Sequence, residues 1–388
     1  MPEGPGFRFA TSGTIIFGPG SLPRVREKLP PEGAVLVVTG NDVSRARPLL
    51  DLIEEHGLEA RVFPVAREPD IETVSRAREA GAEAECRAVV AIGGGSALDA
   101  GKAAAALIAN PGDPRQYLEV VGEGNPLRST PLPFIAVPTT AGTGSEATRN
   151  AVIACPEQSV KVSLRSYLLL PALAVVDPEL ALTLPPRPTA ESGMDALAQL
   201  LEGFISLRAS PLTDAIAREG LRAAGRGLRR AYRHGSDLEA RTEMALAALC
   251  SGMVLANAGL GAPHGFAGPL GGMFPVPHGA ACARLLAPAL AVTLEALRRR
   301  GPGSPAETRL AEAGRLLSGR EKAEAGDAVA WTAETAWDLG IRPLSAFGVT
   351  RADIPVLIEK AGRSSSMKGN PVALTEVEMT RILEEAIG

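Results

Sequence analysis

The sequence predicts an N-terminal α/β domain with a parallel, Rossmann-like sheet, followed by an all-α C-terminal domain. In the first half of the chain, short continuous apolar runs alternate with helical patterns, which is typical of parallel strands buried on both faces. Beyond a proline-rich break at 185–188 the patterns are almost all helical. Because 388 residues are long for one core, we expect two domains, at 1–182 and 183–388.

The expected elements follow from these patterns. In the first domain we expect strands at 34–38, 60–63, 88–92, 134–138 and 174–176, and helices at 45–56, 71–81 and about 96–109. In the second domain we expect helices near 189–206, 213–233, 237–258, 306–318 and 325–339. Glycine- and proline-rich stretches at 259–269 and 301–305 are expected to separate helices.

Composition excludes several classes of protein. The chain is 45% hydrophobic and 22% charged, so it can bury a large core. A net charge of -4 gives no support for a nucleic-acid surface. We find no run of about 18 apolar residues, which argues against a membrane span, and no signal-like N-terminus. The four cysteines form no CxxC pair and are interpreted as reduced structural thiols of a cytoplasmic protein.

Two loops of small residues each follow a predicted strand. The first is Gly93-Gly94-Gly95-Ser96, which opens a helix; such a loop suits a phosphate group but also fits a simple tight turn. The second runs from Pro138 to Glu146 and is rich in hydroxyls. Because ligands bind at the carboxyl ends of parallel strands, the two loops together predict a nucleotide site. The candidate contacts are Gly93, Gly94, Gly95, Ser96, Asp99, Thr139, Thr140, Thr143 and Ser145.

The helical half contains a candidate metal site. Asp195 and Gln199 are four residues apart in a predicted helix and so share a face. His264 and His278 lie in one glycine- and proline-rich segment. Imidazoles with a carboxylate are common ligands for divalent transition metals. From the residues alone, a solvated helix face and two unrelated histidines remain an equally simple interpretation.

Taken together, these motifs resemble the iron-containing (group III) alcohol dehydrogenase family. The resemblance covers nearly the whole chain, with the motifs in the family's order. Besides the two loops, it rests on these segments: Ile15–Gly20, Asp99 with Lys102, Asp177-Pro178, Gly193-Met194-Asp195, His264, Pro277-His278-Gly279 and Gly369-Asn370-Pro371.

The resemblance implies a dehydroquinate synthase-like architecture and reversible alcohol and carbonyl chemistry. NAD(P) would bind to the α/β domain and a divalent metal, iron or zinc, to the helical domain, with catalysis in the cleft between them. Asp195, His264 and His278 match catalytic metal ligands of the family. Gln199 stands where the family usually has the fourth ligand, a histidine, and Gly268 replaces a histidine linked to proton transfer. We therefore expect Gln199 to be a weaker ligand and the metal to be held loosely.

The resemblance also bears on the cofactor. Lys161 matches a family lysine near the nicotinamide ribose. Many family members place an aspartate after the first strand to bind the ribose 2′-hydroxyl, whereas this chain has Gly40 and Asn41. Since Gly40 removes a charge that would repel a 2′-phosphate, we expect NADP to be accepted, with a modest preference over NAD.

Other interpretations remain open. A metal-independent enzyme similar to maleylacetate reductase and a catalytically inactive nucleotide-binding homologue both agree with the changes at Gln199 and Gly268. A sugar-phosphate cyclase of similar architecture would need more basic residues and histidines. We expect a small alcohol or carbonyl substrate, neither nucleic acid nor membrane as a partner, and a homo-oligomer, a dimer or larger.

Overall fold

The computed structural model describes residues 6–158 and 160–388, and the chain divides into two compact units. One unit is Thr11–Leu184, and the other is Pro185–Gly388 together with the residues up to Ala10. The division lies two residues beyond the expected position. Residues 6–10 also join the helical unit rather than the α/β unit, where Ala10 N donates to Asn257 Oδ1 at 2.8 Å and Asn257 Nδ2 donates to Ala10 O at 2.9 Å.

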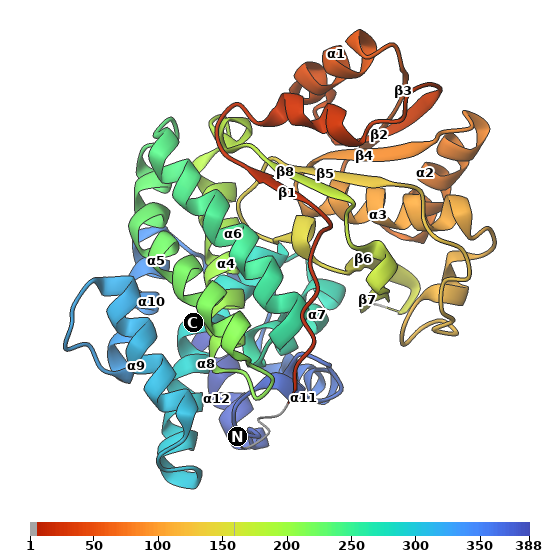
Figure 1. Cartoon of the computed structure of the whole chain (residues 1–388). Coiled ribbons are helices and arrows are strands. Elements are labelled where there is room, and N and C mark those ends of the chain that lie inside the picture. Colours follow the sequence, from red (N-terminus) through yellow and green to blue (C-terminus); the bar gives the residue numbers. More distant parts are fainter. Residues whose placement is uncertain (1–5, 159) are drawn as a thin grey trace. The chain divides into compact units, whose positions relative to one another are not determined.

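The first unit is built on a parallel sheet of six strands, which confirms the predicted α/β class (Figure 1). The strand order is β1-β8-β5-β4-β2-β3, and every neighbouring pair is parallel. The strands are β1 (Ile15–Phe17), β2 (Ala34–Gly40), β3 (Glu59–Val65), β4 (Ala88–Gly93), β5 (Phe134–Pro138) and β8 (Leu173–Val176). β2, β4, β5 and β8 are buried nearly throughout, as their continuous apolar runs predicted.

Helices cover both faces of this sheet. On one face, Leu49 and Ile53 of α1 (Arg47–Glu55) belong to a buried cluster with Val35 and Val90. On the other face, α2 (Ile71–Glu83) and α3 (Gly95–Ala109) pack on the alternate side chains of the same strands. The order in which successive strands join the sheet reverses between β2 and β4. Open α/β sheets bind ligands in the crevice at the carboxyl ends of the strands at such a point.

A separate two-stranded hairpin was not predicted from the sequence. β6 (Asn150–Cys155) and β7 (Val160–Arg165) are antiparallel. Every second residue of β6 is buried, and Ile153 and Leu164 pack with Leu107 of α3. The period-two pattern is short and only weakly apolar, which explains why it was missed.

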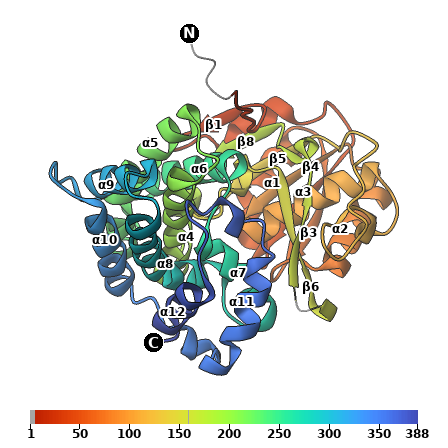
Figure 2. The same cartoon turned by 90° about the horizontal axis from the view of Figure 1, so that it is seen from below.

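In the residues that the structure describes, the second unit contains helices joined by loops and no strands. The helices are α4 (Pro186–Ile205), α5 (Pro211–Arg233), α6 (Leu238–Ala258), α7 (Ala262–Met273), α8 (His278–Arg300), α9 (Pro305–Ser318), α10 (Ala325–Asp338), α11 (Ile354–Gly362) and α12 (Glu376–Ile387). α4 is buried along most of its length and contacts α5, α6 and α8 (Figure 2). Polar side chains on α4 therefore lie in the interior of this unit.

The glycine- and proline-rich stretch at 259–269 was expected to separate two helices, but most of it belongs to α7. Pro263 lies in the first turn of α7, where its missing N–H costs no hydrogen bond. Gly265 permits close packing, since an added Cβ would lie 2.9 Å from Met367 Cε. Pro263 and Gly265 thus serve the start and the packing of α7, while Pro269 lies inside the helix.

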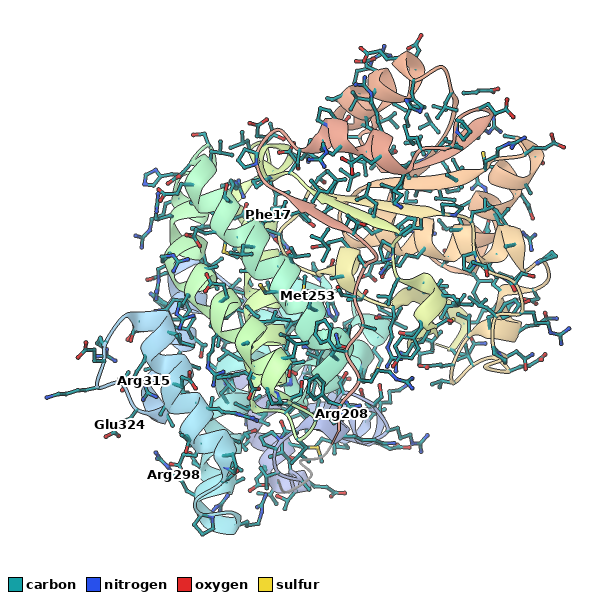
Figure 3. The ribbon with its side chains drawn as sticks, viewed as in Figure 1. Phe17, Arg208, Met253, Arg298, Arg315 and Glu324 are labelled. Carbon is teal, nitrogen blue, oxygen red and sulfur yellow. The ribbon has the colours of Figure 1, made fainter. Side chains whose placement is uncertain are left out.

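α8 was not predicted from the sequence, although it is one of the two longest helices. By length and composition it is apolar enough to cross a membrane, but 72% of its most apolar window is buried inside the protein. Its last turn carries Arg298, whose Nε lies 2.7 Å from Glu307 Oε1 on α9 (Figure 3). The burial and the polar last turn are typical of a core helix.

Candidate active site

The two loops of small residues lie side by side at the carboxyl edge of the sheet. β4 pairs with β5 so that Gly93 is opposite Pro138, and Thr139 N donates to Gly93 O at 2.9 Å. Gly40, at the end of β2, also lies close to Gly93, because a Cβ on Gly93 would lie 3.3 Å from Gly40 N. The fold thus brings together three segments that sequence reasoning assigned to the cofactor.

The glycines of the first loop allow the second loop to approach. An added Cβ on Gly94 would lie 3.3 Å from Thr140 Oγ1, and one on Gly95 would lie 2.7 Å from Thr143 Cγ2. The close contact between the two loops is therefore enough by itself to require small residues at positions 94 and 95. The first turn of α3 starts at Gly95. Ala97 N and Leu98 N donate to Gly94 O, so the N–H groups of Gly95 and Ser96 are the ones without a partner within the helix, which suits an anion.

Asp99 and Ser145, two of the candidate cofactor contacts, bind to each other. Ser145 Oγ donates to Asp99 Oδ1 at 2.6 Å, and Asp99 Oδ2 accepts from Val152 N at 3.0 Å. Lys102 Nζ, which is buried, donates to Ser145 Oγ and to Thr148 Oγ1. These three side chains join α3, the second loop and β6, so their contacts support the shape of the loop.

This network perturbs the titration of two buried groups. Burial lowers the pKa of Lys102 to about 8, although Asp99 and Glu146 oppose the shift. Burial raises the pKa of Glu146 to about 7, and its own backbone N–H and Lys102 offset only part of the increase. Glu146 therefore changes charge near neutral pH, in the loop that follows β5.

The remaining cofactor candidates lie near this edge with partners of their own. Lys161 Nζ is 2.5 Å from Glu68 Oε2, in the connection after β3. Asn41 is exposed. Beside it, Asp42 accepts hydrogen bonds from Ser44 Oγ and Ser44 N, which lower the pKa of Asp42. An ionised carboxylate thus lies close to the position considered for a 2′-phosphate.

In the helical unit, three helices bring polar side chains to one point. Asp195, Gln199 and Glu202 lie at i, i+4 and i+7 on α4, so they share a face, and all three are buried. His264 lies in the first turn of α7. His278 is the first residue of α8, and Cys282 follows one turn later on the same face. Sequence reasoning identified Asp195, His264 and His278 but treated Cys282 as structural.

Four potential ligand atoms converge there. His264 Nε2 is 3.3 Å and His278 Nε2 is 3.7 Å from Asp195 Oδ1. Cys282 Sγ is 3.5 Å from His264 Nε2 and 3.6 Å from His278 Nε2. All four atoms lie within 4.8 Å of one another. Among the described residues, this is the group of His, Cys, Asp and Glu side chains with the geometry to hold a metal ion.

Glu202 orients His264. Glu202 Oε1 is 2.6 Å from His264 Nδ1, while Glu202 Oε2 accepts from Gly261 N at 2.7 Å and from His264 N at 3.3 Å. The carboxylate therefore caps the start of α7 and fixes the plane of the imidazole ring. A carboxylate on the outer nitrogen of a ligand histidine orients the ring and makes it more basic. Sequence reasoning missed Glu202, although its position one turn after Gln199 offered a signal.

Gln199 has a different orientation from the one expected of a ligand. Its Nε2 donates to Asp195 Oδ2 at 3.1 Å, and its Oε1 accepts from Ser251 Oγ at 2.9 Å. Ser251 Oγ also lies 2.8 Å from Ala248 O and has one proton to donate, so Asp195 determines the orientation: reversing the amide would set its oxygen against the carboxylate. The oxygen of Gln199 is thus directed to α6, and its amide nitrogen faces the carboxylate.

The cluster requires positive charge. Asp195 Oδ1 is buried and has no hydrogen-bond partner of good geometry among the described residues. Burial alone would raise the pKa of Asp195, but His278 and His264 hold it below its usual value. Burial opposes charge on His264 too, yet Cys282, Glu202 and Asp195 raise its pKa well above the ordinary value. Four potential ligand atoms that converge on one buried point, with a carboxylate oxygen among them, fit a divalent cation.

Comparisons with known proteins match both units of the chain to one family. The family model of the iron-containing alcohol dehydrogenases matches residues 12–178, and the model of the family's C-terminal part matches residues 189–387. The chain belongs to the iron-containing alcohol dehydrogenase family. The family uses NAD(P) and a divalent metal, so this chain is an NAD(P)-dependent oxidoreductase that acts on CH–OH groups of small alcohols and on the corresponding carbonyls.

Individual relatives of this alcohol dehydrogenase match over nearly their whole length. The 1,3-propanediol dehydrogenase of Klebsiella pneumoniae is 34% identical over 98% of each chain. A crystal structure of 1,3-propanediol oxidoreductase superimposes with a TM-score of 0.91 at 32% identity, covering 98% of this chain and 100% of the other. Sulfoacetaldehyde reductase from Bifidobacterium kashiwanohense, solved with NAD+, gives a TM-score of 0.87 at 27% identity over 99% of each chain. An inactive homologue is not favoured by these matches.

The raised pKa of Glu146 leads to a testable effect on stability. In the folded protein this carboxyl holds its proton up to about pH 7, whereas in the unfolded chain it ionises near 4.5. Glu146 therefore contributes stability below pH 4.5 that is lost as the pH rises through 7. Glu146→Gln should gain stability relative to wild type across this window, by up to about 3 kcal/mol.

Thermal midpoints of both proteins, measured from pH 5 to pH 7.5, test this expectation. The difference between them should grow with pH. A difference that is constant across the range would mean that the carboxyl is already ionised at pH 5.

Proposed function

We propose that this enzyme interconverts a small alcohol and its carbonyl with NAD(P) bound at the sheet edge and a divalent cation bound by Asp195, His264 and His278. The observation that carries the proposal is the buried Asp195 Oδ1, which faces both imidazole Nε2 atoms within 3.7 Å but has no hydrogen-bond partner of good geometry among the described residues. A carboxylate with two imidazoles is a sufficient ligand set for catalytic zinc. We also propose that the protein is cytoplasmic and forms a homo-oligomer.

Each side chain of the cluster has a separate task in this proposal. Glu202 fixes the ring of His264, so Nε2 is the nitrogen available as a ligand. Gln199 holds Asp195 Oδ2, which leaves Oδ1 directed at the imidazoles. We therefore propose that Gln199 positions the carboxylate and is not itself a ligand. Gly268 has open space where a Cβ would lie, so no side chain replaces the family's histidine there.

The direction of substrate approach follows from exposure. The side chain of His278 is 35% exposed, whereas those of His264 and Asp195 are 6% and 2% exposed. A substrate oxygen therefore reaches the cluster from the side of His278. The cation, when bound, supplies Lewis-acid polarisation of that oxygen, worth several kcal/mol in the transition state. The nicotinamide, when bound, carries the hydride.

The cofactor residues support binding of either nicotinamide nucleotide. Gly40, Asn41, Gly93–Ser96 and the second loop at 139–145 surround one edge of the sheet, and we propose that they bind NAD(P), with Lys161 near the ribose. Asp99 and Ser145 act by shaping the loop. Since position 40 lacks a charge, the proposal includes a modest preference for NADPH. Asp42 opposes this preference, because the hydrogen bonds from Ser44 favour its ionised form.

A substitution at position 40 should reverse the proposed preference for NADPH over NADH. A Cβ on Gly40 would have no neighbour within 4 Å, so Gly40→Asp introduces charge without a steric conflict. The aspartate should repel the 2′-phosphate and accept a hydrogen bond from the 2′-hydroxyl of NADH. We expect kcat/KM with NADPH to fall by roughly 10- to 100-fold relative to NADH.

Gly40→Asn is the matched control, because it has the same shape without the charge. Both variants and wild type should be compared with both cofactors on one aldehyde. If Gly40→Asp lowers kcat/KM equally for both cofactors, or if wild type strongly prefers NADH, the proposed NADPH preference is wrong.

Removing the metal should affect turnover and cofactor binding differently. Chelation is expected to abolish NADPH-dependent reduction of an aldehyde, because Asp195 and the two histidines then lack their cation. Binding of NADPH should persist, since its residues belong to the other unit. Metal content, turnover and NADPH fluorescence titration measure these three properties, and added Zn²⁺ or Fe²⁺ should restore turnover.

Asp195→Asn is the matched variant, because it keeps the shape of the side chain and removes its charge. It should retain less metal than wild type and still bind NADPH. Full turnover by chelated wild type without detectable metal would replace the proposal with a metal-independent reductase. Metal-loaded protein that binds NADPH but reduces no aldehyde or ketone would contradict the enzymatic function itself.

A further inference from the structure

We propose that Cys282 is the fourth protein ligand of this metal site and that its sulfur favours zinc over iron. The inference rests on the proposed metal site and adds one residue to it. Cys282 was grouped with three other cysteines as structural, but Cys282 alone among them belongs to the cluster that the described residues form. The donor set would then be one carboxylate, two imidazoles and one thiolate.

The position of Cys282 on α8 directs it to the site. His278 and Cys282 are four residues apart in α8 and therefore project from the same face. Cys282 is completely buried, and both imidazole Nε2 atoms lie close to its sulfur. The helix that supplies one imidazole thus also supplies the sulfur, with no loop between them.

The distances agree with a tetrahedral arrangement. With zinc–sulfur and zinc–nitrogen bonds of about 2.3 and 2.05 Å, the edge of a tetrahedron between sulfur and nitrogen is about 3.5–3.6 Å. The two observed separations of Sγ from the imidazole Nε2 atoms are 3.5 and 3.6 Å. An oxygen–nitrogen edge is about 3.3–3.4 Å for similar bonds, and Asp195 Oδ1 is 3.3 Å from His264 Nε2. Asp195 Oδ1 is 3.7 Å from His278 Nε2, which is longer than such an edge, so three of these four separations match the spacing around a single zinc ion.

Cys282 compensates for the residue at position 199. The oxygen of Gln199 accepts a hydrogen bond from Ser251, and its nitrogen donates to Asp195, so α4 offers one ligand where the family has two. The sulfur approaches from α8 instead. The number of protein ligands is then kept at four, while one nitrogen is exchanged for sulfur.

This exchange changes the charge and the softness of the site. Thiolates prefer zinc and other soft or borderline ions, whereas carboxylate and imidazole alone discriminate less. Asp195 and a Cys282 thiolate also balance the two charges of the cation, which suits a buried cluster. Binding breaks the S–H bond and forms a bond from sulfur to the metal, and the proton leaves to water. Substrate would add as a further ligand on the exposed side of His278.

Cobalt substitution tests the inference without relying on turnover. Chelated protein reconstituted with Co²⁺ should show an intense near-ultraviolet charge-transfer band from the thiolate, together with weaker visible bands. Cys282→Ser should lose the near-ultraviolet band and keep the visible bands. Competition between Zn²⁺ and Fe²⁺ should show that wild type prefers zinc and that Cys282→Ser loses at least about 10-fold of this preference.

The chain offers a matched control and a rescue. Cys250→Ser removes another buried cysteine, on α6, and should leave the spectrum unchanged. Adding Gln199→His to Cys282→Ser should restore tight binding by a nitrogen from α4, still without the near-ultraviolet band. This double variant also guards against a misfolded single variant, because recovered binding requires an intact cluster.

The outcomes separate the inference from the proposed function. A near-ultraviolet band that is absent in wild type, or retained by Cys282→Ser, would overturn the role of Cys282 even if the enzyme reduces aldehydes. If the band appears as expected in a protein that reduces no aldehyde, the ligand role stands and the proposed function fails.

Discussion

The structure of the helical unit depends on one buried carboxylate that needs a positive charge. Asp195 lies on the most enclosed helix, and burying a carboxylate without a compensating positive charge costs several kcal/mol. Its two oxygens have different neighbours: Gln199 donates a hydrogen bond to Oδ2, whereas Oδ1 faces the two imidazoles. The same face of α4 carries Glu202, which caps the start of α7. One polar stripe on α4 thus sets the positions from which His264 and His278 reach the site.

Much of the fold could be predicted because its signals are local. The parallel strands are continuous apolar runs, and α5 and α6 begin at capping residues, Ser210 and Asp237. α7 could not be found in the same way, since glycine and proline usually end helices. There they allow a close approach, as at Gly265 against Met367. The hairpin of β6 and β7 has too short an alternation to stand out before its packing on α3 is known.

The site was predicted in part for a similar reason. Asp195, His264 and His278 could be named from motifs, and the glycine loops from their place after strands. Cys282 could not, because a lone cysteine has no spacing signature, and its relation to Asp195 exists only when α8 packs on α4. The role of Gln199 as a ligand stays a prediction, because the sequence shows which side chain is present but not that its oxygen accepts a hydrogen bond from Ser251, 52 residues away.

Sulfur in the first coordination sphere is the feature on which the account depends most. X-ray absorption at the zinc edge, recorded on wild-type protein reconstituted with zinc, measures it directly. We expect one sulfur at about 2.3 Å and lighter ligands at about 2.0–2.2 Å. A coordination sphere of nitrogen and oxygen alone would contradict it and would return Cys282 to the structural role that its burial first indicated.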